Sequence, residues 1–369
     1  MRKWVALMLF LGFAWPAIAA RTVSVNEMEH LLDSLRGRSD EKVAAEVDHV
    51  QLTERVSLPK IALWEVEFPG PRERVALVKL VDLSAFLYPP AADLPRDPAP
   101  DIEAQKHILG MAEQYVNTMA SRLPDFYAIQ VRTSFRDTPH VNDDRSGDGT
   151  TDLHYTGEYG KRVTYRDGHE VPFESANAPA NKPPAEHINL VHGVFGPILE
   201  QIMGDALQSG VRFLRWELES GRMTAVFGYT VPANASHFSV GIMMGDRVTT
   251  LFPAYHGEIE LDRETGEILR VTEVADMTPP GEAMITIDYA PVPIGPRSYI
   301  VPVWAVAFMK SPVPMYNAQG RSLVLTEMDD VAFINFHKFS STARIVPDWN
   351  GQGATIHPNN TEPTDGKQH

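Results

Sequence analysis

The chain of 369 residues contains no cysteine. This absence excludes disulfide bonds, thiol catalysis, zinc–thiolate sites and iron–sulfur clusters. A chain of this length can fold in an oxidising compartment without disulfides, because it can bury a large hydrophobic core. Basic residues are also scarce, with 33 Lys and Arg against 48 Asp and Glu. This acidic balance disfavours nucleic acid and anionic membranes as partners, since both are bound through basic surfaces.

Long apolar segments are absent beyond the first twenty residues. Two basic residues precede an apolar run from Trp4 to Trp15, which Pro16 interrupts, and residues 17–19 have the small-x-small spacing of a signal-peptidase site. The run is too short to span a bilayer comfortably. It predicts a signal peptide over residues 1–19, and a buried core helix is the alternative. We therefore expect a periplasmic or secreted protein without a transmembrane segment in its mature chain.

Motifs of established catalytic chemistry are missing as well. The sequence has no G-x-S-x-G nucleophile elbow, no S-x-x-K motif with its partner motifs, no phosphate-binding loop and no dinucleotide fingerprint. His169 and Glu170 are not followed by the second histidine of the H-E-x-x-H zinc motif. A site assembled from distant histidines is the alternative that spacing leaves open. We therefore expect a protein that is not an enzyme and has no cofactor.

One polar stretch, DDRSGDGTTDLHY, is similar to a calcium-binding loop. Asp144 and Asp148 occupy the first and fifth ligand positions, and Gly149 follows where such a loop turns tightly. The twelfth position holds Tyr155, where the loop requires a bidentate glutamate. We therefore predict a polar loop between strands, with Asp144 and Asp148 as weak candidates for a metal site.

Apolar residues at intervals of three and four predict helices in the first part of the chain. The first helix is expected to begin near Val25 with Asn26 as its N-cap, and the second to run from Asp40 to Leu52. Shorter helices follow, so we assign residues 20–87 to a helical N-terminal region. Five prolines then predict a linker over residues 88–101. Two further helices are predicted at residues 102–122 and 195–208.

From Phe126 onward, apolar and polar residues alternate, which predicts β-strands separated by turns. The predicted strands cover residues 126–135, 161–166, 211–219, 222–231, 236–243, 247–252, 256–262, 267–275, 283–290, 299–309, 321–328 and 331–339. Sequential hairpins of this kind indicate a large, strongly curved antiparallel sheet, which the helix at 195–208 covers. The predicted fold class is therefore α+β, with the sheet domain at 102–346 and a disordered tail at 347–369.

The segment YHGEIELDRETGEILRV, residues 255–271, predicts a hairpin with one apolar and one acidic face. Gly266 is expected in the left-handed region, after a type I turn. We interpret the acidic face as solvated, and the apolar face as covering either a ligand cavity or a packed core. The apolar residues include Ile259 and Leu261, and the acidic residues are Glu258, Glu260 and Asp262.

Two further strands carry separate predictions. Glu217 and Glu219 lie two residues apart on one predicted strand, so both project from the same face, which we interpret as solvated. The strand at 299–309 is apolar on both faces, with Trp304 on one of them. This pattern predicts a central strand that is covered on both sides.

Several segments together resemble a large uncharacterised family of exported bacterial proteins that is abundant in acidobacteria. They are LPDFYAIQVRTSF, FGPILEQIMGDA, VRFLRWELESGRMTAVFGYTVP, FPAYHGEIELDRETGEILRVTEVAD, YIVPVWAVAFM and FINFHKFSSTARI, and the similarity extends from about Val25 to Ile345. The motif G-x-I-x-[LI]-D-x-x-T-G-x-I-x-R is also similar to hairpins of the lipoprotein-sorting (LolA/LolB-like) superfamily. In that superfamily helices close an open β half-barrel over an apolar cavity. The resemblance implies a β-domain that carries an acyl chain or another apolar group.

Eight side chains are candidates for the lining of such a cavity, and ordinary core packing is the alternative for each. They are Trp216, Phe227, Tyr229, Ile259, Leu261, Ile285, Ile287 and Trp304. The leading functional hypothesis is thus a non-catalytic extracytoplasmic protein that binds a lipid or another apolar small molecule. The second is a scaffold with a filled core that binds another envelope protein, and the third is a hydrolase built from dispersed residues.

Overall fold

The computed structural model describes residues 21–137, 153–171, 193–244, 247–278, 281–311, 315–316, 322–323 and 325–339. Within these residues it contains six α-helices and an antiparallel sheet of ten strands that is not closed, which confirms the α+β class. The predicted signal peptide, the loop with Asp144 and Asp148 and the predicted tail lie outside the described residues. In the part of the chain that is described, no helix has the length and apolar character needed to cross a membrane.

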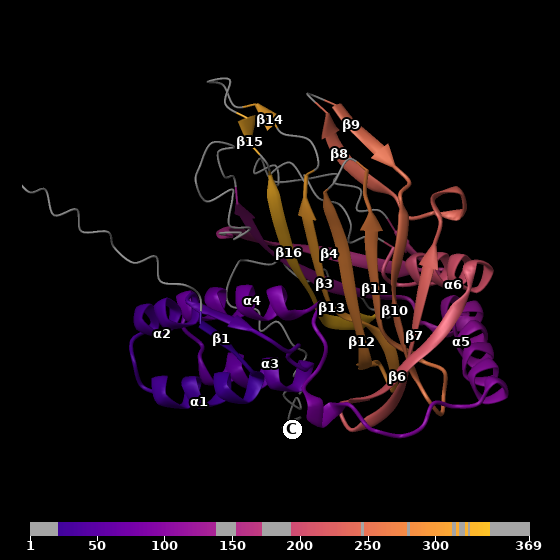
Figure 1. The fold of residues 1–369 in the computed structure, drawn as a ribbon, viewed down its shortest axis with the longest axis horizontal. Coiled ribbons are helices and arrows are strands. Elements are labelled where there is room, and N and C mark those ends of the chain that lie inside the picture. The colour runs from indigo at the N-terminus through magenta and orange to yellow at the C-terminus, as the bar shows by residue number, and fades with distance from the viewer. Residues whose placement is uncertain are drawn as a thin grey trace, which may run out of the picture.

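Residues 21–88, called the N-terminal layer below, form two short parallel strands and four helices (Figure 1). Strand β1 (Arg21–Val23) pairs with β2 (Val50–Leu52). The helices are α1 (Val25–Leu35), α2 (Asp40–Val47), α3 (Leu58–Glu67) and α4 (Pro71–Ser84). Each helix buries apolar side chains, among them Met28, Val43, Trp64 and Leu77, as amphipathic helices do when they pack on a core.

Two details of the predicted helices are wrong. The N-cap of α1 is Ser24 rather than Asn26, because Ser24 and Glu27 form a capping box. The Ser24 hydroxyl accepts a hydrogen bond from the Glu27 N–H at 3.3 Å, and the Glu27 carboxylate accepts one from the Ser24 N–H at 2.7 Å. Helix α2 ends at Val47, five residues earlier than predicted, because residues 50–52 extend to pair with β1.

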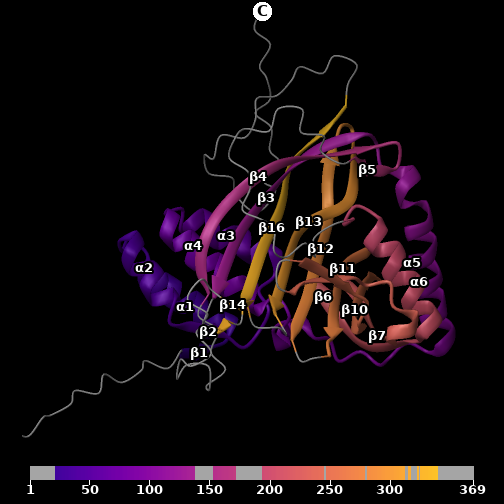
Figure 2. The ribbon, with the colours of Figure 1, turned by 90° about the horizontal axis from the view of Figure 1, so that it is seen from above.

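Most adjacent strands of the large antiparallel sheet also follow one another in the chain, and its two edge strands are β5 (His169–Val171) and β6 (Val211–Glu219). Figure 2 shows β3 and β4 bent into an arc at one side of it. The strand order is β5 (His169–Val171), β4 (His154–Arg166), β3 (Phe126–Asp137), β16 (Thr326–Lys338), β13 (Arg297–Lys310), β12 (Glu282–Ile294), β11 (Ile268–Asp276), β10 (Ala254–Asp262), β7 (Arg222–Val231) and β6 (Val211–Glu219). Smaller pairs are β8 (Val240–Met244) with β9 (Arg247–Leu251) and β14 (Met315–Tyr316) with β15 (Ser322–Leu323).

Strand β13 lies near the middle of the sheet, between β12 and β16, as its apolar sequence predicts. All its residues from 300 to 309 are buried. The predicted break between strands at 321–328 and 331–339 is wrong, because β16 continues through Asp329 and Asp330. Aspartates are typical of turns, but here Ser134 and Trp304 donate hydrogen bonds to the two carboxylates, at 2.6 and 2.5 Å.

Helices lie on both sides of the sheet (Figures 1 and 2). Helix α5 (Ile102–Arg122) and helix α6 (Pro197–Ser209) lie on one side, and the N-terminal layer lies on the other. The sheet face toward α6 is called the apolar face, and its paired residues include Phe227, Ile259, Val271, Ile287 and Ala305. The face toward the N-terminal layer is called the polar face, and it carries Arg215, Glu217, Glu258, Glu260, Arg270 and Asp288.

The turn between β10 and β11 confirms the prediction for Gly266, which has φ 69°. Helix α5 passes close to this turn, since a Cβ atom at Gly266 would lie 2.5 Å from the Cβ of Met111. A glycine is therefore required here both for its positive φ and for the approach of the helix. Two 3₁₀ turns, η1 (Ala91–Asp93) and η3 (Ala233–Ala235), complete the described elements.

Candidate functional site

The eight candidate cavity residues are all buried, but the structure divides them between the two faces. Seven belong to the apolar side and pack in the hydrophobic core, where Phe227, Ile259 and Ile287 face the α6 side of the sheet. Trp304 lies on the opposite face, because it pairs with Asp288. Trp216 also donates a hydrogen bond from Nε1 to the backbone oxygen of Pro98, which joins the linker to the edge of the sheet.

The acidic residues of the 255–271 hairpin and of β6 do not form a solvated face, so that prediction is wrong. Glu217 and Glu260 are each 1% exposed, and Asp262 is 5% exposed. Only Glu258 and Glu219 are half-buried. The physical reason is that the N-terminal layer covers this face and supplies an arginine to it. A strand pattern alone does not reveal which side of a sheet a second layer will cover.

Three arginines neutralise the buried carboxylates of the polar face. Arg55, which follows β2, donates from Nη2 to Glu217 at 2.7 Å and to Glu260 at 2.9 Å. Arg215 donates from Nε to Glu217 at 2.7 Å and from both terminal nitrogens to Glu258, at 2.8 and 2.6 Å. Bidentate pairs of this kind are among the stronger hydrogen bonds in proteins.

The third arginine, Arg270 on β11, joins the sheet to the end of α4. Its Nη1 donates to both oxygens of Asp288, at 2.6 and 2.7 Å, and its Nη2 donates to the backbone oxygen of Ala85. Arg55 holds the same segment, because its backbone N–H donates to the Tyr88 oxygen at 2.8 Å. Residues 85–88 are thus held by the sheet at Ala85 and by the backbone of Arg55 at Tyr88.

Burial shifts the pKa values of the carboxyl groups in this network. Burial raises the pKa of Glu217 to about 7, and repulsion from Glu260 adds to the effect while Arg55 opposes it. Burial also disfavours the ionised form of Glu260, but Arg55 and Arg270 attract it strongly enough to lower its pKa. Burial also raises the pKa of Glu219 to about 7 and that of Asp288 above its ordinary value, so protonation of these carboxyl groups reduces the repulsion within the network.

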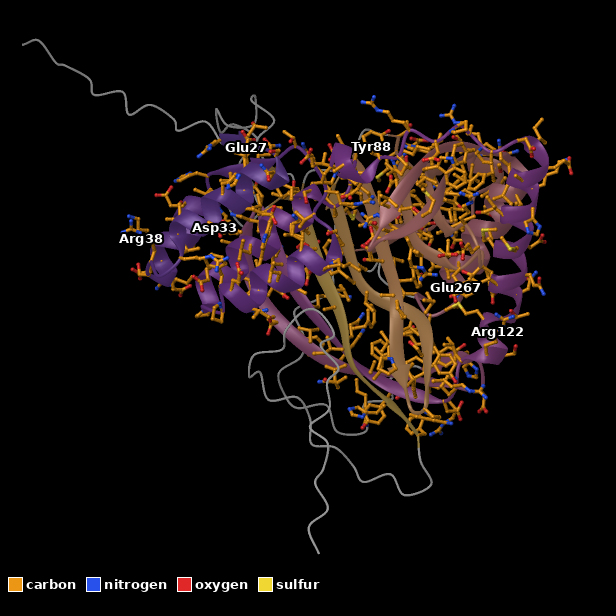
Figure 3. All side chains as sticks on the ribbon, turned by 90° about the horizontal axis from the view of Figure 1, so that it is seen from below. Glu27, Asp33, Arg38, Tyr88, Arg122 and Glu267 are labelled. Atoms are coloured by element: carbon orange, nitrogen blue, oxygen red, sulfur yellow. The ribbon has the colours of Figure 1, made fainter. Side chains whose placement is uncertain are left out.

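A cleft of about 710 Å³ opens on the polar face beside this network. One wall is the segment 85–88, and the opposite wall is formed by β6 with neighbouring residues of β7, β10 and β11. The Tyr88 ring lies 4.5 Å from the Arg215 guanidinium carbon, and Figure 3 places Tyr88 between the N-terminal helices and the sheet. The apolar residues that line the cleft include Phe86, Leu87, Tyr88, Val211, Leu214 and Val274.

Gly228 shapes the cleft. A Cβ atom at this position would lie 2.8 Å from the Leu214 Cδ1, so the missing side chain lets Leu214 lie across β7. Of the eight predicted cavity residues, Tyr229 is the one that also lines the cleft. Its ring packs against Tyr255 on the apolar side, and its hydroxyl donates to the backbone oxygen of Thr272 at 2.6 Å.

A second polar cluster lies on the apolar side, between α6 and the loop after η3. Asp205 is buried and accepts hydrogen bonds from the His237 backbone N–H at 3.0 Å and from the Tyr255 hydroxyl at 2.8 Å. The His237 ring nitrogen Nδ1 lies 2.6 Å from the other Asp205 oxygen, while the side chain of His237 is 75% exposed. This geometry anchors the loop to α6 at two points, and we interpret it as structural.

The described residues contain no group of three or more His, Cys, Asp and Glu side chains that could hold a metal ion. The predicted calcium ligands Asp144 and Asp148 lie outside those residues. The arginines of the cleft were missed by sequence reasoning. The sequence does show charged residues that alternate with apolar ones on neighbouring strands, namely Arg215, Glu217, Glu258, Glu260 and Arg270. Which of these side chains lie next to one another can be inferred only once the register of the strands is known.

Comparisons of the chain with protein-family models, with curated proteins and with solved structures found no match.

Proposed function

We propose that this protein is a non-catalytic binding protein of the extracytoplasmic space. Its cleft on the polar face would hold an amphipathic small molecule, such as a lipid or another molecule with an acyl chain. The observation that carries the proposal is the cleft itself, whose volume of about 710 Å³ is within the range of ligand-binding sites. The resemblance to lipoprotein-sorting half-barrels supports a ligand with an apolar part.

The walls of the cleft supply the apolar contacts. Leu87 and Tyr88 are 36% and 61% exposed, which is unusual for large apolar side chains that lie side by side. Leu214, Val211 and Val274 face the same space. An acyl chain or a flat apolar ring laid against these residues would remove this surface from water, and we expect that burial to provide most of the binding free energy.

The floor of the cleft supplies the polar contacts. Arg55, Arg215 and Arg270 all line it, but each guanidinium is already paired with a carboxylate. An anionic head group would have to displace a carboxylate partner, so the paired floor favours an uncharged polar group. The hydroxyls of Thr230 and Thr272, which also line the cleft, are suited to hydrogen-bond such a group.

Extracytoplasmic location is part of the proposal and is tested separately. The apolar run from Trp4 to Trp15 and the small-x-small spacing of residues 17–19 support it. N-terminal sequencing of the protein isolated from the cells that produce it should begin near Ala20. A chain that retains residues 1–19 would contradict export through a cleaved signal peptide.

Ligand binding can be tested with an uncharged fluorescent apolar probe, N-phenyl-1-naphthylamine. Thr230 is exposed and lines the cleft, so Thr230→Trp should fill the space and strongly reduce probe fluorescence. Thr250→Trp is the matched control, because Thr250 is exposed on β9 and does not line the cleft. Equal probe fluorescence from both variants and the unmodified protein would contradict binding in the cleft.

Native mass spectrometry of the gently purified protein provides a second test, because it reports bound molecules directly. A protein that carries a ligand should show an added small mass that Thr230→Trp removes.

The alternative function, a scaffold for an envelope protein, is favoured by Leu63 and Val66, which are exposed on α3. A protein partner that Leu63→Glu releases, without any bound small molecule, would favour the scaffold.

A further inference from the structure

A small cavity lies between the N-terminal layer and the centre of the sheet. Its volume of about 10 Å³ is close to the space that one water molecule requires. Helices α3 and α4 provide one side of it, and strands β13 and β16 provide the other. Its lining combines the rings of Trp64 and Trp304 with the acidic residues Glu65, Asp82 and Asp330. Of these, Asp82 lies on a helix and Asp330 on the sheet that it packs against.

The geometry of these two carboxyl groups requires a proton. Asp82 and Asp330 are 1% and 2% exposed, and both line the same small cavity. Trp304 donates from Nε1 to the Asp330 Oδ2 at 2.5 Å. In the described part of the chain, no N–H or hydroxyl donor reaches either oxygen of Asp82. A proton carried by one carboxyl group is the donor that can satisfy such a pair.

The surroundings do not neutralise the pair. Glu65 on α3 and Asp329 on β16 add negative charge on the side of Asp82. Arg74 on α4 attracts Asp330, but its guanidinium is paired at 2.5 Å with Glu158 on β4, which repels Asp330. Arg132 on β3 pairs with Asp329 at 3.5 Å, as Arg74 does with Glu158. Both of these cations therefore already face other carboxylates, so ionisation of both buried aspartates is costly.

The direction of the pKa shifts agrees with this geometry. Burial raises the pKa of Asp82 far above its ordinary value, and the neighbouring Asp330 carboxylate raises it further. Burial also raises the pKa of Asp330, to about 7, although Trp304 and the hydrogen bond from Asp82 stabilise its ionised form. Asp82 is therefore the proton donor of the pair, and Asp330 is the acceptor.

We infer that Asp82 and Asp330 form a proton-binding site, and that the shared proton holds the N-terminal layer against the sheet. Asp82 lies on α4, three residues before the segment 85–88 that forms one wall of the cleft. Loss of the proton would leave two facing negative charges at this interface and would loosen α4 together with that wall. The inference about the proton does not depend on the proposed ligand, whereas the effect on the cleft rests on the proposed function.

The sign of the pH dependence follows from the raised pKa values. Both carboxyl groups are protonated in the folded and unfolded states below about pH 4, near the ordinary aspartate pKa, so the stabilisation is fully present there. At higher pH the unfolded chain releases these protons while the folded protein keeps them. The folding equilibrium constant should therefore fall by about tenfold per pH unit for each retained proton. Asp330 stops contributing above its folded pKa of about 7, and Asp82 continues.

The test compares Asp82→Asn with the unmodified full chain by urea unfolding between pH 5 and pH 9. The asparagine amide can still donate to Asp330 but carries no titrating proton, so the pH slope of the folding equilibrium should decrease by about one proton. Asp33→Asn is the matched control, because Asp33 is a surface residue of α1 whose side chain is 60% exposed. The control should keep the slope of the unmodified protein.

A slope that Asp82→Asn leaves unchanged would overturn the inference. Should that variant not fold, Asp330→Asn tests the same site from the sheet, where it should reduce the slope in the same way. Hydrogen exchange of the unmodified protein provides an independent measurement, with intrinsic exchange rates corrected for pH. Amides of α4 should lose protection as the pH rises from 6 to 9, before those of β12 and β13. Equal loss in all three elements would contradict a local proton site and would leave the proposed ligand cleft unaffected.

Discussion

Helices cover both faces of the ten-stranded sheet and bury apolar side chains there, but the polar face also has the buried Arg55 and Arg270 at its interface with the N-terminal layer. On the apolar face, α6 packs against side chains such as Phe227 and Ile259, which are fully buried in one hydrophobic cluster. On the polar face, the N-terminal layer meets the sheet through Arg55, Arg270 and the pair Asp82–Asp330. The free energy gained by burying apolar side chains depends little on their orientation or on pH. The free energy of buried charged groups depends on the geometry of their ion pairs and on their protonation.

This difference assigns different roles to the two layers. The apolar side provides stability, because hydrophobic burial contributes roughly 25 cal/mol for each Å² removed from water. The polar side gains less, because the cost of removing charges from water offsets much of their attraction. The cleft and the proton site lie on this side.

The largest expected effect is that of breaking the polar network at Arg55. Arg55→Met should destabilise the protein by about 3–5 kcal/mol, because it leaves Glu260 buried without its hydrogen-bonded cation and Glu217 with Arg215 alone. Urea unfolding at pH 7 measures the loss. Adding Glu217→Gln and Glu260→Gln should recover a large part of it, since the unpaired charges are then removed. A triple variant as unstable as the single one would show that Arg55 acts through packing rather than charge.

A change on the apolar face should have a somewhat smaller effect with a different signature. Ile259→Ala should cost about 2–5 kcal/mol through lost burial and a cavity. The loss should be the same at pH 5 and pH 8, whereas that of Arg55→Met should change with pH. Thermal or urea unfolding at both pH values makes the comparison. If the loss of unfolding free energy caused by Ile259→Ala depends on pH, the proposed difference between the two faces is contradicted.

The smallest effect is expected for an exposed ion pair of the N-terminal layer. Arg72 and Glu41 form a salt bridge in which the two side chains are 63% and 71% exposed. Glu41→Gln should change the unfolding free energy by less than about 0.5 kcal/mol, because water already solvates both charges. A loss comparable to that of Arg55→Met would mean that burial does not decide the strength of ion pairs in this protein.

Local patterns predicted much of the secondary structure. Strands β6 and β7 coincide with the predicted ranges 211–219 and 222–231, and the turn at Gly266 has the expected conformation. These features depend on neighbouring residues, through alternation and turn chemistry. The break predicted near Asp329 and Asp330 was wrong, because their hydrogen-bond partners come from other strands. Rules that use only residues close in the sequence do not predict hydrogen-bond partners that come from other strands.

The candidate site was less predictable than the fold. The predicted cavity residues were sought among apolar side chains, and the structure places seven of the eight in the packed side of the sheet. The cleft lies on the face that was interpreted as solvated. Arg55 is separated from Glu217 and Glu260 by more than 160 residues, so only the packing of the N-terminal layer on the sheet brings them together.

The sequence by itself determined the class of this protein: a cysteine-free acidic chain with amphipathic helices, antiparallel strands and a glycine at a turn that requires positive φ. These properties follow from composition and from contacts between residues close in the chain. The tertiary structure alone decided which face of the hairpin at 255–271 is covered, which carboxylates receive arginines and which share a proton. Those outcomes depend on a second layer folding onto the sheet, because a carboxylate is solvated or buried according to what packs above it.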